Sequence, residues 1–365
     1  MNILLFLVAI TFKEFKLKSE YFKTLLAKER LKYHETDFLD ILPLDLDFSF
    51  QTYRFNGNDR WLYYYTINIP IFTSKHVLFY PRYRNIKKLK KLTDSLAVLR
   101  AEKTMLMIYS KLWYYSRIID VMDSLIFYYK KARTLYSYLP ANQKKVIEED
   151  LKLFEAEQEL TLLVGEREQL LKRIKSDKTY EIVIEETYNE LVDMAIKLKN
   201  TMDSLNLKIE HIRYRLARMD EIDAYSRMLP HLSYLYMRQF AGFDPLNPVG
   251  SNTISGISLN FNLSVPQCIK AIKRARLNKR RLRVELEAKR YSEKHRINIA
   301  QVNKMKINTD RMDEMLNNYY KKIKLGYENN SLKKEDYINE LLFYHEKCRY
   351  LIELKYETLM NILSK

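Results

Sequence analysis

The stretch that decides the fold of this chain is Gly256–Val265, which reads GISLNFNLSV. Apolar and polar side chains alternate along it without an error, so the two classes point to opposite faces of a β-strand. The apolar positions are Ile257, Leu259, Phe261, Leu263 and Val265. The segment therefore predicts one strand with one apolar and one polar face.

Three further segments alternate in the same way. Residues 44–51 and 61–72 do so over most of their length, whereas 232–237 is weaker because Leu235 and Met237 fall on the polar face. The apolar face of 61–72 carries Trp61, Tyr63, Tyr65, Ile67, Ile69 and Ile71. These four strands are the only extended segments that we predict in a chain otherwise made of helix.

Alternating strands have two explanations. One is a soluble antiparallel sheet with a single face on a core. The other is a transmembrane barrel, apolar toward lipid and polar toward its interior. Aromatic residues gathered at the start of 61–72 favour the barrel, since such residues form belts at membrane interfaces. Even the smallest membrane barrels need about eight strands, so several chains must each contribute four.

The two halves of the chain repeat each other. Residues 41–44 (ILPL) match 228–231 (MLPH) at an offset of 187, and 146–151 match 332–337 at an offset of 186. Two separated matches at nearly the same offset indicate a tandem duplication. In each half the proline ends a helix and begins a strand, because it has a fixed φ and no N–H.

The predicted boundaries follow from this duplication. Residues 1–12 are a candidate secretory signal, with a buried N-terminal helix as the alternative. The first repeat is 13–187, with a helix at 13–42, a strand hairpin at 43–72, a long helix at 82–139 and a return helix at 146–175. The second repeat is 188–365, with a helix, a strand hairpin at 230–265, a long helix at 266–326 and a return helix at 334–363.

Helix lengths predict the architecture. Two helices of about 30 residues stacked end to end match one long helix of 58 residues, which would extend roughly 85–90 Å. The fold class we expect is mainly α with a small β part: two strands plus long antiparallel coiled helices, repeated in tandem. The strands of several copies would form an oligomeric β-barrel continuous with an α-helical tunnel.

The net charge of +17 is mostly spread over helix faces that also carry 46 acidic residues. The exception is the basic segment 270–283, in which eight of fourteen residues are Lys or Arg. Such a cluster can bind phosphates, lipid headgroups or an anionic solute. A cytosolic helical scaffold that binds nucleic acid through 270–283 is therefore one alternative. A periplasmic coiled-coil adaptor, which would have helical hairpins without lipid-facing strands, is another.

Sequence motifs of enzymes are missing. The chain contains no GxxxxGK[ST], GxGxxG, HExxH or GxSxG, so we expect neither catalysis nor a cofactor. Cys268 and Cys348 form no CxxC, and the pair His345 and Cys348 lacks a second pair of ligands. We therefore expect no metal site.

The repeated order of helix, hairpin, long helix and return helix resembles that of the TolC-like outer-membrane efflux proteins, over residues 13–365. The most similar segments are 229–230 (LP) with 255–261 (SGISLNF), and 326–332 (GYENNSL) leading to Asp336. The resemblance implies a homotrimeric duct of a tripartite efflux or type I secretion system, in contact with outer-membrane lipid and reaching into the periplasm. Its implied partners are a periplasmic adaptor and an inner-membrane pump of the RND or ABC type, and no nucleic acid.

The resemblance also assigns residues to a gate at the periplasmic tip. Tyr327 looks like the family's tip tyrosine, which links neighbouring helices. Asp336 matches an aspartate at the narrowed entrance, and Asp150 is its counterpart in the first repeat. Three copies of such an aspartate would form an anionic ring able to bind a cation. A first-turn helix acid is the alternative explanation for Asp150.

Three positions depart from the family pattern. Asn330 replaces the tip glycine but tolerates a left-handed backbone. Asn339 replaces the second entrance acid, and Leu332 replaces an expected basic residue. The lipid-facing surface is assigned to the strand positions Trp61, Tyr63, Tyr65, Ile67, Ile257, Leu259, Phe261 and Leu263.

Overall fold

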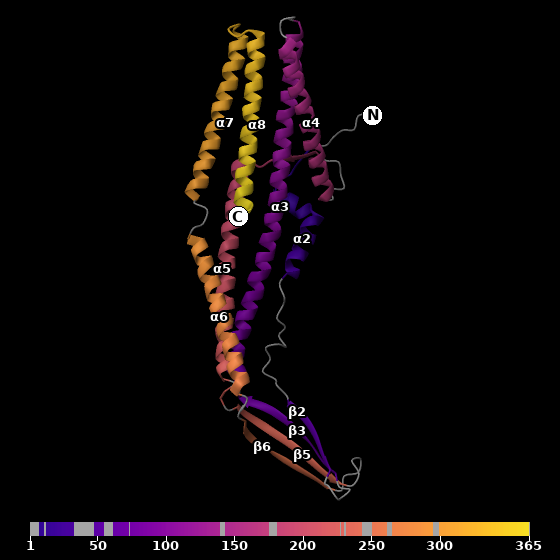
Figure 1. The fold of residues 1–365 in the computed structure, drawn as a ribbon, viewed down its shortest axis with the longest axis vertical. Coiled ribbons are helices and arrows are strands. Elements are labelled where there is room, and N and C mark those ends of the chain that lie inside the picture. Colours follow the sequence, from indigo (N-terminus) through magenta and orange to yellow (C-terminus); the bar gives the residue numbers. More distant parts are fainter. Residues whose placement is uncertain are drawn as a thin grey trace. The chain divides into compact units, whose positions relative to one another are not determined.

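Eight helices and six strands make up the described part of the chain (Figure 1). The computed structural model describes residues 7–10, 12–32, 47–54, 61–72, 74–138, 143–174, 181–226, 228–229, 231–242, 250–260, 265–294 and 299–364. In chain order the elements are β1 (Leu7–Ile10), α1 (Phe12–Lys18), α2 (Glu20–Leu31), β2 (Asp47–Arg54), β3 (Trp61–Phe72), α3 (Ser74–Ser137), α4 (Gln143–Arg173), β4 (Glu181–Ile184), α5 (Tyr188–Ser226), β5 (His231–Gly242), β6 (Gly250–Asn260), α6 (Val265–Lys294), α7 (Ile299–Glu328) and α8 (Lys334–Ser364).

These elements fall into two compact units. The first unit is built from residues 1–33, 95–204 and 293–365, and the second from 34–94 and 205–292. Helices α3 and α5 contribute residues to both units. Each unit therefore combines segments from both halves of the sequence.

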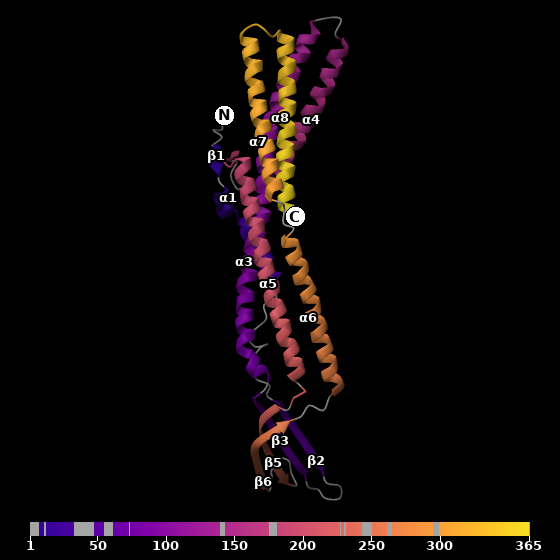
Figure 2. The same cartoon turned by 90° about the vertical axis from the view of Figure 1, so that its left-hand side faces the viewer.

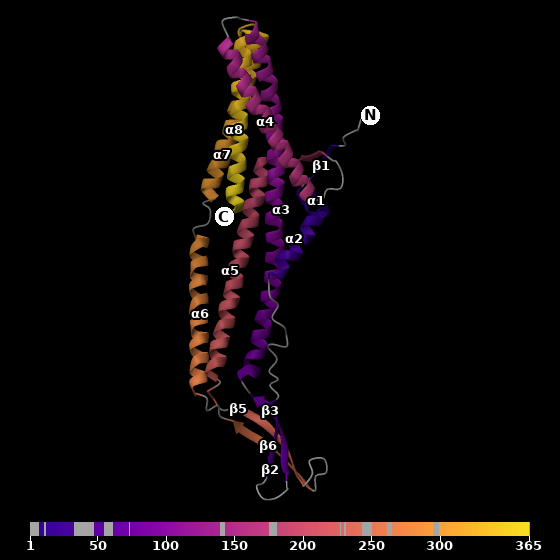
Figure 3. The same cartoon turned by 45° about the vertical axis from the view of Figure 1, so that its right-hand side comes forward.

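The first unit is organised around the C-terminal two thirds of α3. Met105, Tyr109, Ile118 and Met122 on this helix are fully buried, at intervals of four or nine residues that keep them on packed faces. Helix α4 runs back along α3 as an antiparallel hairpin (Figure 3), and α7 and α8 form a second hairpin (Figure 2). Side chains of α3, α4 and α8 share one buried cluster that includes Leu153 and Leu342.

A second cluster in the same unit holds the N-terminal elements. Strand β1 pairs in parallel with β4, from Leu7 opposite Glu181 to Ile10 opposite Ile184. Glu186 then accepts hydrogen bonds from the Phe12 backbone N–H, at 2.6 Å, and from the Tyr109 hydroxyl. The carboxylate raises the pKa of Tyr109, with burial as the larger cause.

Helix α5 begins with a capping box at Thr187. The Glu190 N–H donates to the Thr187 hydroxyl at 3.4 Å, and the Thr187 N–H donates to the Glu190 carboxylate at 2.8 Å. Two N–H groups that the first helical turn would leave unpaired are satisfied in this way. The backbone hydrogen bond lowers the pKa of Glu190.

The second unit contains an antiparallel sheet of four strands in the order β2-β3-β5-β6 (Figure 1). The two hairpins join through β3 and β5, with Tyr65 opposite Arg238. The register shifts between Pro70 and Phe72. A bulge there has a physical reason, because proline cannot donate a hydrogen bond to a neighbouring strand.

Several predicted helix boundaries are wrong. The segment 13–42 forms two helices, α1 and α2, of which the second ends at Leu31, and residues 33–46 lie outside the described part. The segment 82–139 begins earlier, at Ser74, with Pro81 inside the helix. Pro81 is the eighth residue of α3, so the helix continues through it although the proline removes one i→i−4 hydrogen bond. Within the segment 266–326, α6 ends at Lys294 and α7 begins at Ile299, and residues 295–298 lie outside the described part.

The strand predictions also need correction. The strand expected at 256–265 is β6, which begins at Gly250 and ends at Asn260, and Val265 opens α6 instead. Residues 261–264 lie outside the described part. The four strands are not the only extended segments, since β1 and β4 form a second sheet. Residues 7–10, predicted as part of a signal segment or buried helix, form a strand in the structure.

Candidate functional site at the turn between α7 and α8

The turn between α7 and α8 contains the segment that resembles the family tip. Asn330 has a positive φ of 55°, the left-handed backbone that asparagine adopts more readily than most residues. The N–H groups of Ser331 and Leu332 donate to the Gly326 carbonyl at 2.9 and 3.0 Å. A Cβ on Gly326 would lie 2.7 Å from Leu332 Cδ1, so glycine permits this close return of the chain.

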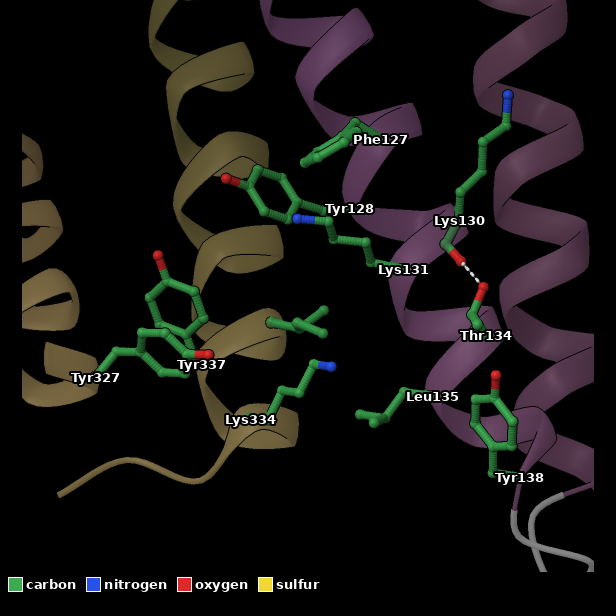
Figure 4. Close-up of a pocket in the computed structure, with 11 residues that line it drawn as sticks. Phe127, Tyr128, Lys130, Lys131, Thr134, Leu135, Tyr138, Tyr327, Lys334 and Tyr337 are labelled. Carbon is green, nitrogen blue, oxygen red and sulfur yellow. Dashed lines mark hydrogen bonds between the residues drawn. The ribbon is translucent and has the colours of Figure 1, made fainter. Parts of the chain in front are cut away.

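Two tyrosines stack across this turn. The rings of Tyr327 on α7 and Tyr337 on α8 lie 4.0 Å apart between centroids and are nearly parallel, at 17° (Figure 4). The Tyr327 side chain is 41% exposed, so one side of the stack remains open to solvent. Burial raises the pKa of Tyr337. The stack therefore links α7 to α8, and the role of Tyr327 as the family's tip tyrosine stays a prediction.

Polar contacts join α8 to the hairpin of α3 and α4. The Tyr136 hydroxyl donates to Asn339 Oδ1 at 3.0 Å, and the Tyr129 hydroxyl donates to Glu346 Oε1 at 3.1 Å. The two tyrosines are seven residues apart on α3, and their partners are seven residues apart on α8 in the opposite direction. This is the register of two antiparallel helices with a heptad seam. Burial, followed by the Glu346 carboxylate, raises the pKa of Tyr129.

Additional contacts strengthen this seam at both of its ends. Lys145 of α4 pairs with Glu335 of α8 at 3.4 Å, and Arg349 of α8 pairs with Glu159 of α4 at 2.7 Å. Figure 4 shows Tyr128 of α3 directed toward α8, where its ring stacks on His345 at 5.3 Å. These polar contacts add to the buried apolar cluster that α3, α4 and α8 share.

The predicted gate residues Asn339, Asp150 and Asp336 have different surroundings in the structure. Asn339 belongs to the seam, through Tyr136. Asp150 pairs with Arg133 of α3 at 2.5 Å, within its own hairpin. Asp336 lies exposed in the first turn of α8, where a negative charge suits the helix N-terminus, and forms no ion pair among the residues described. Within one chain, Asp150 and Asp336 therefore have different surroundings: Asp150 is paired with a cation, and Asp336 is exposed at a helix N-terminus.

Sequence reasoning missed the residues that carry the seam. Tyr129, Tyr136, Glu335, Glu346 and Lys145 did not stand out as candidates, since tyrosine is abundant in this chain. A usable signal was present: a tyrosine pair at a spacing of seven on α3, and a polar pair at the same spacing on α8.

The apolar positions of the strands lie in rows across the sheet. Ile69 of β3 faces Tyr234 of β5, which faces Ile257 of β6, and their exposures are 39%, 38% and 72%. Opposed residues of antiparallel strands point to the same face. Tyr65 and Ile67 lie in adjacent rows of this face and are half-buried. The sheet thus exposes apolar side chains on one face in a single chain.

The remaining assigned strand residues are only partly described. Trp61 and Tyr63 lie in β3 opposite Gly242 and Phe240, and Leu259 lies in β6 opposite Leu232. Phe261 and Leu263 lie outside the described residues. The lipid-facing role of all these positions stays a prediction.

The basic segment 270–283 lies on α6, which runs beside α5 (Figure 2). Lys279 and Arg276 pair with Glu221 of α5 at 2.6 and 3.6 Å. Arg281 and Arg283 pair with carboxylates one turn further along α6. Half of the eight cations are thus engaged inside the chain, which weakens the nucleic-acid alternative because phosphates are bound by uncompensated Lys and Arg.

Ligand-binding chemistry is sparse in the described residues. No group of three or more His, Cys, Asp or Glu side chains there is arranged to hold a metal. Cys268 and Cys348 are both free thiols. Among the helices that the structure describes, none combines the length and the apolar character needed to cross a bilayer.

Comparison with solved structures identifies the fold. The outer membrane protein VceC of Vibrio cholerae superposes with a TM-score of 0.59 and 12% identity, over 96% of this chain and 93% of that one. The CmeC outer membrane channel of Campylobacter jejuni gives 0.59 and 12%, over 96% and 81%. The open state of the MtrE outer membrane channel of Neisseria gonorrhoeae gives 0.59 and 10%, over 96% and 84%. No protein-family profile matches the sequence, and no curated protein does.

At these identities the likeness establishes the fold alone. The chain has the fold of outer-membrane channel proteins, mainly helical with a small sheet. The resemblance to the TolC-like family that the sequence suggested is therefore confirmed at the level of fold.

Proposed function

We propose that this chain is a passive export duct of an outer membrane, the channel component of a tripartite efflux or type I secretion system. The exposed apolar face of the four-stranded sheet carries the proposal. Exposure of its central row, Ile69, Tyr234 and Ile257, to water is unfavourable in free energy, whereas contact of this row with lipid is favourable. The solved structures of the same fold that are named as outer membrane channels support this assignment.

The sheet is complete only with further copies. Strands β2 and β6 are its outer strands, and each has one strand partner among the residues described. An open edge in a membrane would leave backbone groups unpaired, so neighbouring copies would join β6 to β2 until a barrel closes. We take three copies as the number, as the resemblance implies, with four strands from each.

Helix α4 carries a second surface suited to a neighbouring copy. Ile147, Leu151, Phe154 and Leu162 are between 59% and 69% exposed and lie three to eight residues apart along one side of the helix. Such spacing is typical of a seam that receives another helix. In the trimer this stripe would lie against a helix of the next copy.

At the helix turns, the seam between α8 and the α3–α4 hairpin would act as the closing contact. Release of Tyr136 from Asn339, and of Lys145 from Glu335, would let the α7–α8 hairpin move away from its neighbours. Asp336 would line the entrance as one member of an anionic ring. A periplasmic adaptor would dock at these turns and couple the duct to an inner-membrane pump.

The strand assignment is tested by two isoleucines on one strand. Ile257 and Ile254 are both exposed, at 72% and 49%, but an odd number of residues apart, so they point to opposite faces. Lysine at a lipid-facing site costs about 2–4 kcal/mol at mid-membrane, whereas a site on the interior face tolerates it. Ile257→Lys should remove the heat-modifiable oligomer from outer-membrane fractions, and Ile254→Lys should retain it.

Equal behaviour of the two variants would reject the assignment of faces. Recovery of the unaltered protein as a soluble monomer after gentle lysis would reject the duct itself. That second result would favour a helical scaffold instead.

The anionic ring is tested in planar bilayers. Asp336→Ala should raise single-channel conductance and reduce block by divalent cations, because it removes the charges at the entrance. Asp150→Ala is the matched control, since its carboxylate is already compensated by Arg133. Unchanged conductance and unchanged cation block in Asp336→Ala would count against the ring.

A further inference from the structure

A pocket of about 390 Å³ opens in the first unit between α3 and the α7–α8 hairpin (Figure 4). Its walls are largely aromatic, formed by Phe127 and Tyr128 of α3, by Tyr138 directly after α3, and by Tyr327 and Tyr337 of the hairpin. Flat rings on both sides favour a flat guest, because aromatic pairs attract by more than the area they bury. The volume is in the range of small-molecule sites.

The charged side chains that line this pocket are all positive. Three lysines and no carboxylate are among the residues that line it. Lys130 is compensated by Glu157 of α4 at 2.9 Å, and Figure 4 shows its ammonium directed away from the space between the helices. Lys131 lies over the Phe127 ring, with Nζ 4.1 Å from the centroid. Lys131 and Lys334 are thus the two lysines lining the pocket whose charge is available to bind an anionic ligand.

The position of Lys334 reinforces this field. It is the first residue of α8, where the unpaired N–H groups of the helix add positive potential. Lys334 forms no ion pair with any described residue. In Figure 4 it extends from α8 toward α3, and Lys131 extends from α3 toward α8. The two ammonium groups approach the same space from opposite sides.

We propose that this pocket binds small aromatic anions, a fused or single ring system that bears one carboxylate or sulfonate. The ring would lie against Tyr327 and Tyr128, and the anionic group would be held between Lys131 and Lys334. Binding is non-covalent and requires no partner protein, so the proposal stands or falls independently of the export function. Because α3, α7 and α8 all contribute walls, a guest stabilises the packing of the hairpin on α3.

The probe is 6-fluoro-2-naphthoate, titrated into the purified full-length protein in detergent and followed by fluorine NMR. Empty micelles supply the reference for partitioning. The uncharged 6-fluoro-2-naphthamide is the matched ligand, with the same ring and no charge. We expect saturable binding of the carboxylate, weakened by added salt, and at least roughly threefold weaker binding of the amide.

Four variants locate the site. Lys131→Gln and Lys334→Gln should each weaken naphthoate binding roughly threefold to tenfold. Lys333→Gln removes the same charge from the adjacent residue, which does not line the pocket, and Lys130→Gln removes a lysine already paired with Glu157. Both should bind as the unaltered protein does. Circular dichroism checks that each variant is folded.

Two outcomes would overturn the proposal. The first is equal affinity for the acid and the amide, which would mean that no charge is recognised. The second is an equal loss in Lys333→Gln and Lys334→Gln, which would mean that only the general positive potential of the turn attracts the probe. Tyr327→Leu supplies an independent check, since loss of the exposed ring should weaken both ligands while the charge preference persists.

Discussion

Helix α3 in the first unit and helix α6 in the second pack in different ways. In the first unit α3 buries a side chain in nearly every turn, from Leu96 to Tyr136. On α6 the buried side chains are Cys268, Ile272 and Leu286, and ion pairs to Glu221 and Glu210 of α5 supply other contacts. The first unit has its own core, whereas α6 leaves apolar positions uncovered.

The exposed apolar positions on α6 are evenly spaced along the helix. Leu277, Val284 and Tyr291 are each 65% exposed and lie seven residues apart. A repeat of seven is the spacing at which one helix presents a continuous seam to another. Burial within one chain thus stabilises the first unit, whereas α6 of the second unit keeps a row of apolar side chains exposed in a single chain.

The largest expected effect comes from making the same substitution, leucine to alanine, once in each unit. Leu191→Ala, in the first unit at 0% exposure, should cost about 2–5 kcal/mol of unfolding free energy because it leaves a cavity. Leu277→Ala should leave the free energy of unfolding of the chain nearly unchanged but lower the temperature at which the oligomer separates on gels. Denaturant titration by circular dichroism measures the first effect. An unchanged oligomer in Leu277→Ala would mean that this side of α6 has no helical neighbour in another copy.

A smaller effect is expected at the charged interface of the second unit. The Glu210 side chain is 3% exposed and is paired with Lys289 at 2.5 Å and Arg213 at 3.1 Å. Lys289→Met removes one partner of a buried carboxylate and should cost about 1–3 kcal/mol. Lys273→Met, on the exposed side of α6, is the control and should be neutral. The double variant Lys289→Met with Glu210→Gln should recover most of the loss, since the buried side chain at 210 is then uncharged and Arg213, which loses that carboxylate, is 43% exposed.

Local patterns predicted much of the fold. Strict alternation located the hairpins, and the scarcity of Gly and Pro located the long helices. Pairing between distant segments could not be predicted: β1 and β4 are short, and their partners lie more than 170 residues apart. Pro81 led to a wrong predicted start for the long helix, at residue 82, because proline is disfavoured in a helix interior and α3 nevertheless continues through it.

The candidate site was predicted less completely. The turn at Asn330 and the exposed Asp336 lie in a contiguous motif, so the sequence could single them out. The seam of Tyr129 and Tyr136 with α8 depends on the register between two helices that are remote in sequence. Such a register becomes visible only when both helices are placed, although matched heptad spacings offer a clue.

The third effect concerns that seam. Tyr129→Phe and Tyr136→Phe each remove one partly buried hydrogen bond and should cost about 1 kcal/mol apiece. If the seam holds the turns closed, the double variant should increase single-channel conductance and speed hydrogen exchange along α8. Tyr138→Phe, directly after the end of α3 and at 78% exposure, is the control for removing a tyrosine hydroxyl outside the seam. Faster exchange without a change in conductance would make the seam structural only.

The smallest effect compares one histidine from each unit. Burial lowers the pKa of His345, which stacks on Tyr128, and burial together with the positive charges of Arg290 and Arg215 lowers the pKa of His211. In both cases the unfolded chain binds a proton more readily than the folded chain. The folded state is therefore fully favoured above the ordinary histidine pKa near 6.5 and loses stability as the pH falls through it.

The two histidines should respond differently to salt. Burial does not depend on ionic strength, so the pH dependence removed by His345→Gln should be the same at low and high salt. The repulsion by Arg290 is screened, so the part removed by His211→Gln should shrink as salt is added. Thermal unfolding at pH 7.5 and 5.0 should show shifts of roughly 1–2 °C for each variant. An equal response to salt would mean that the charges on α6 do not reach α5 strongly enough to matter, and that burial alone acts on both histidines.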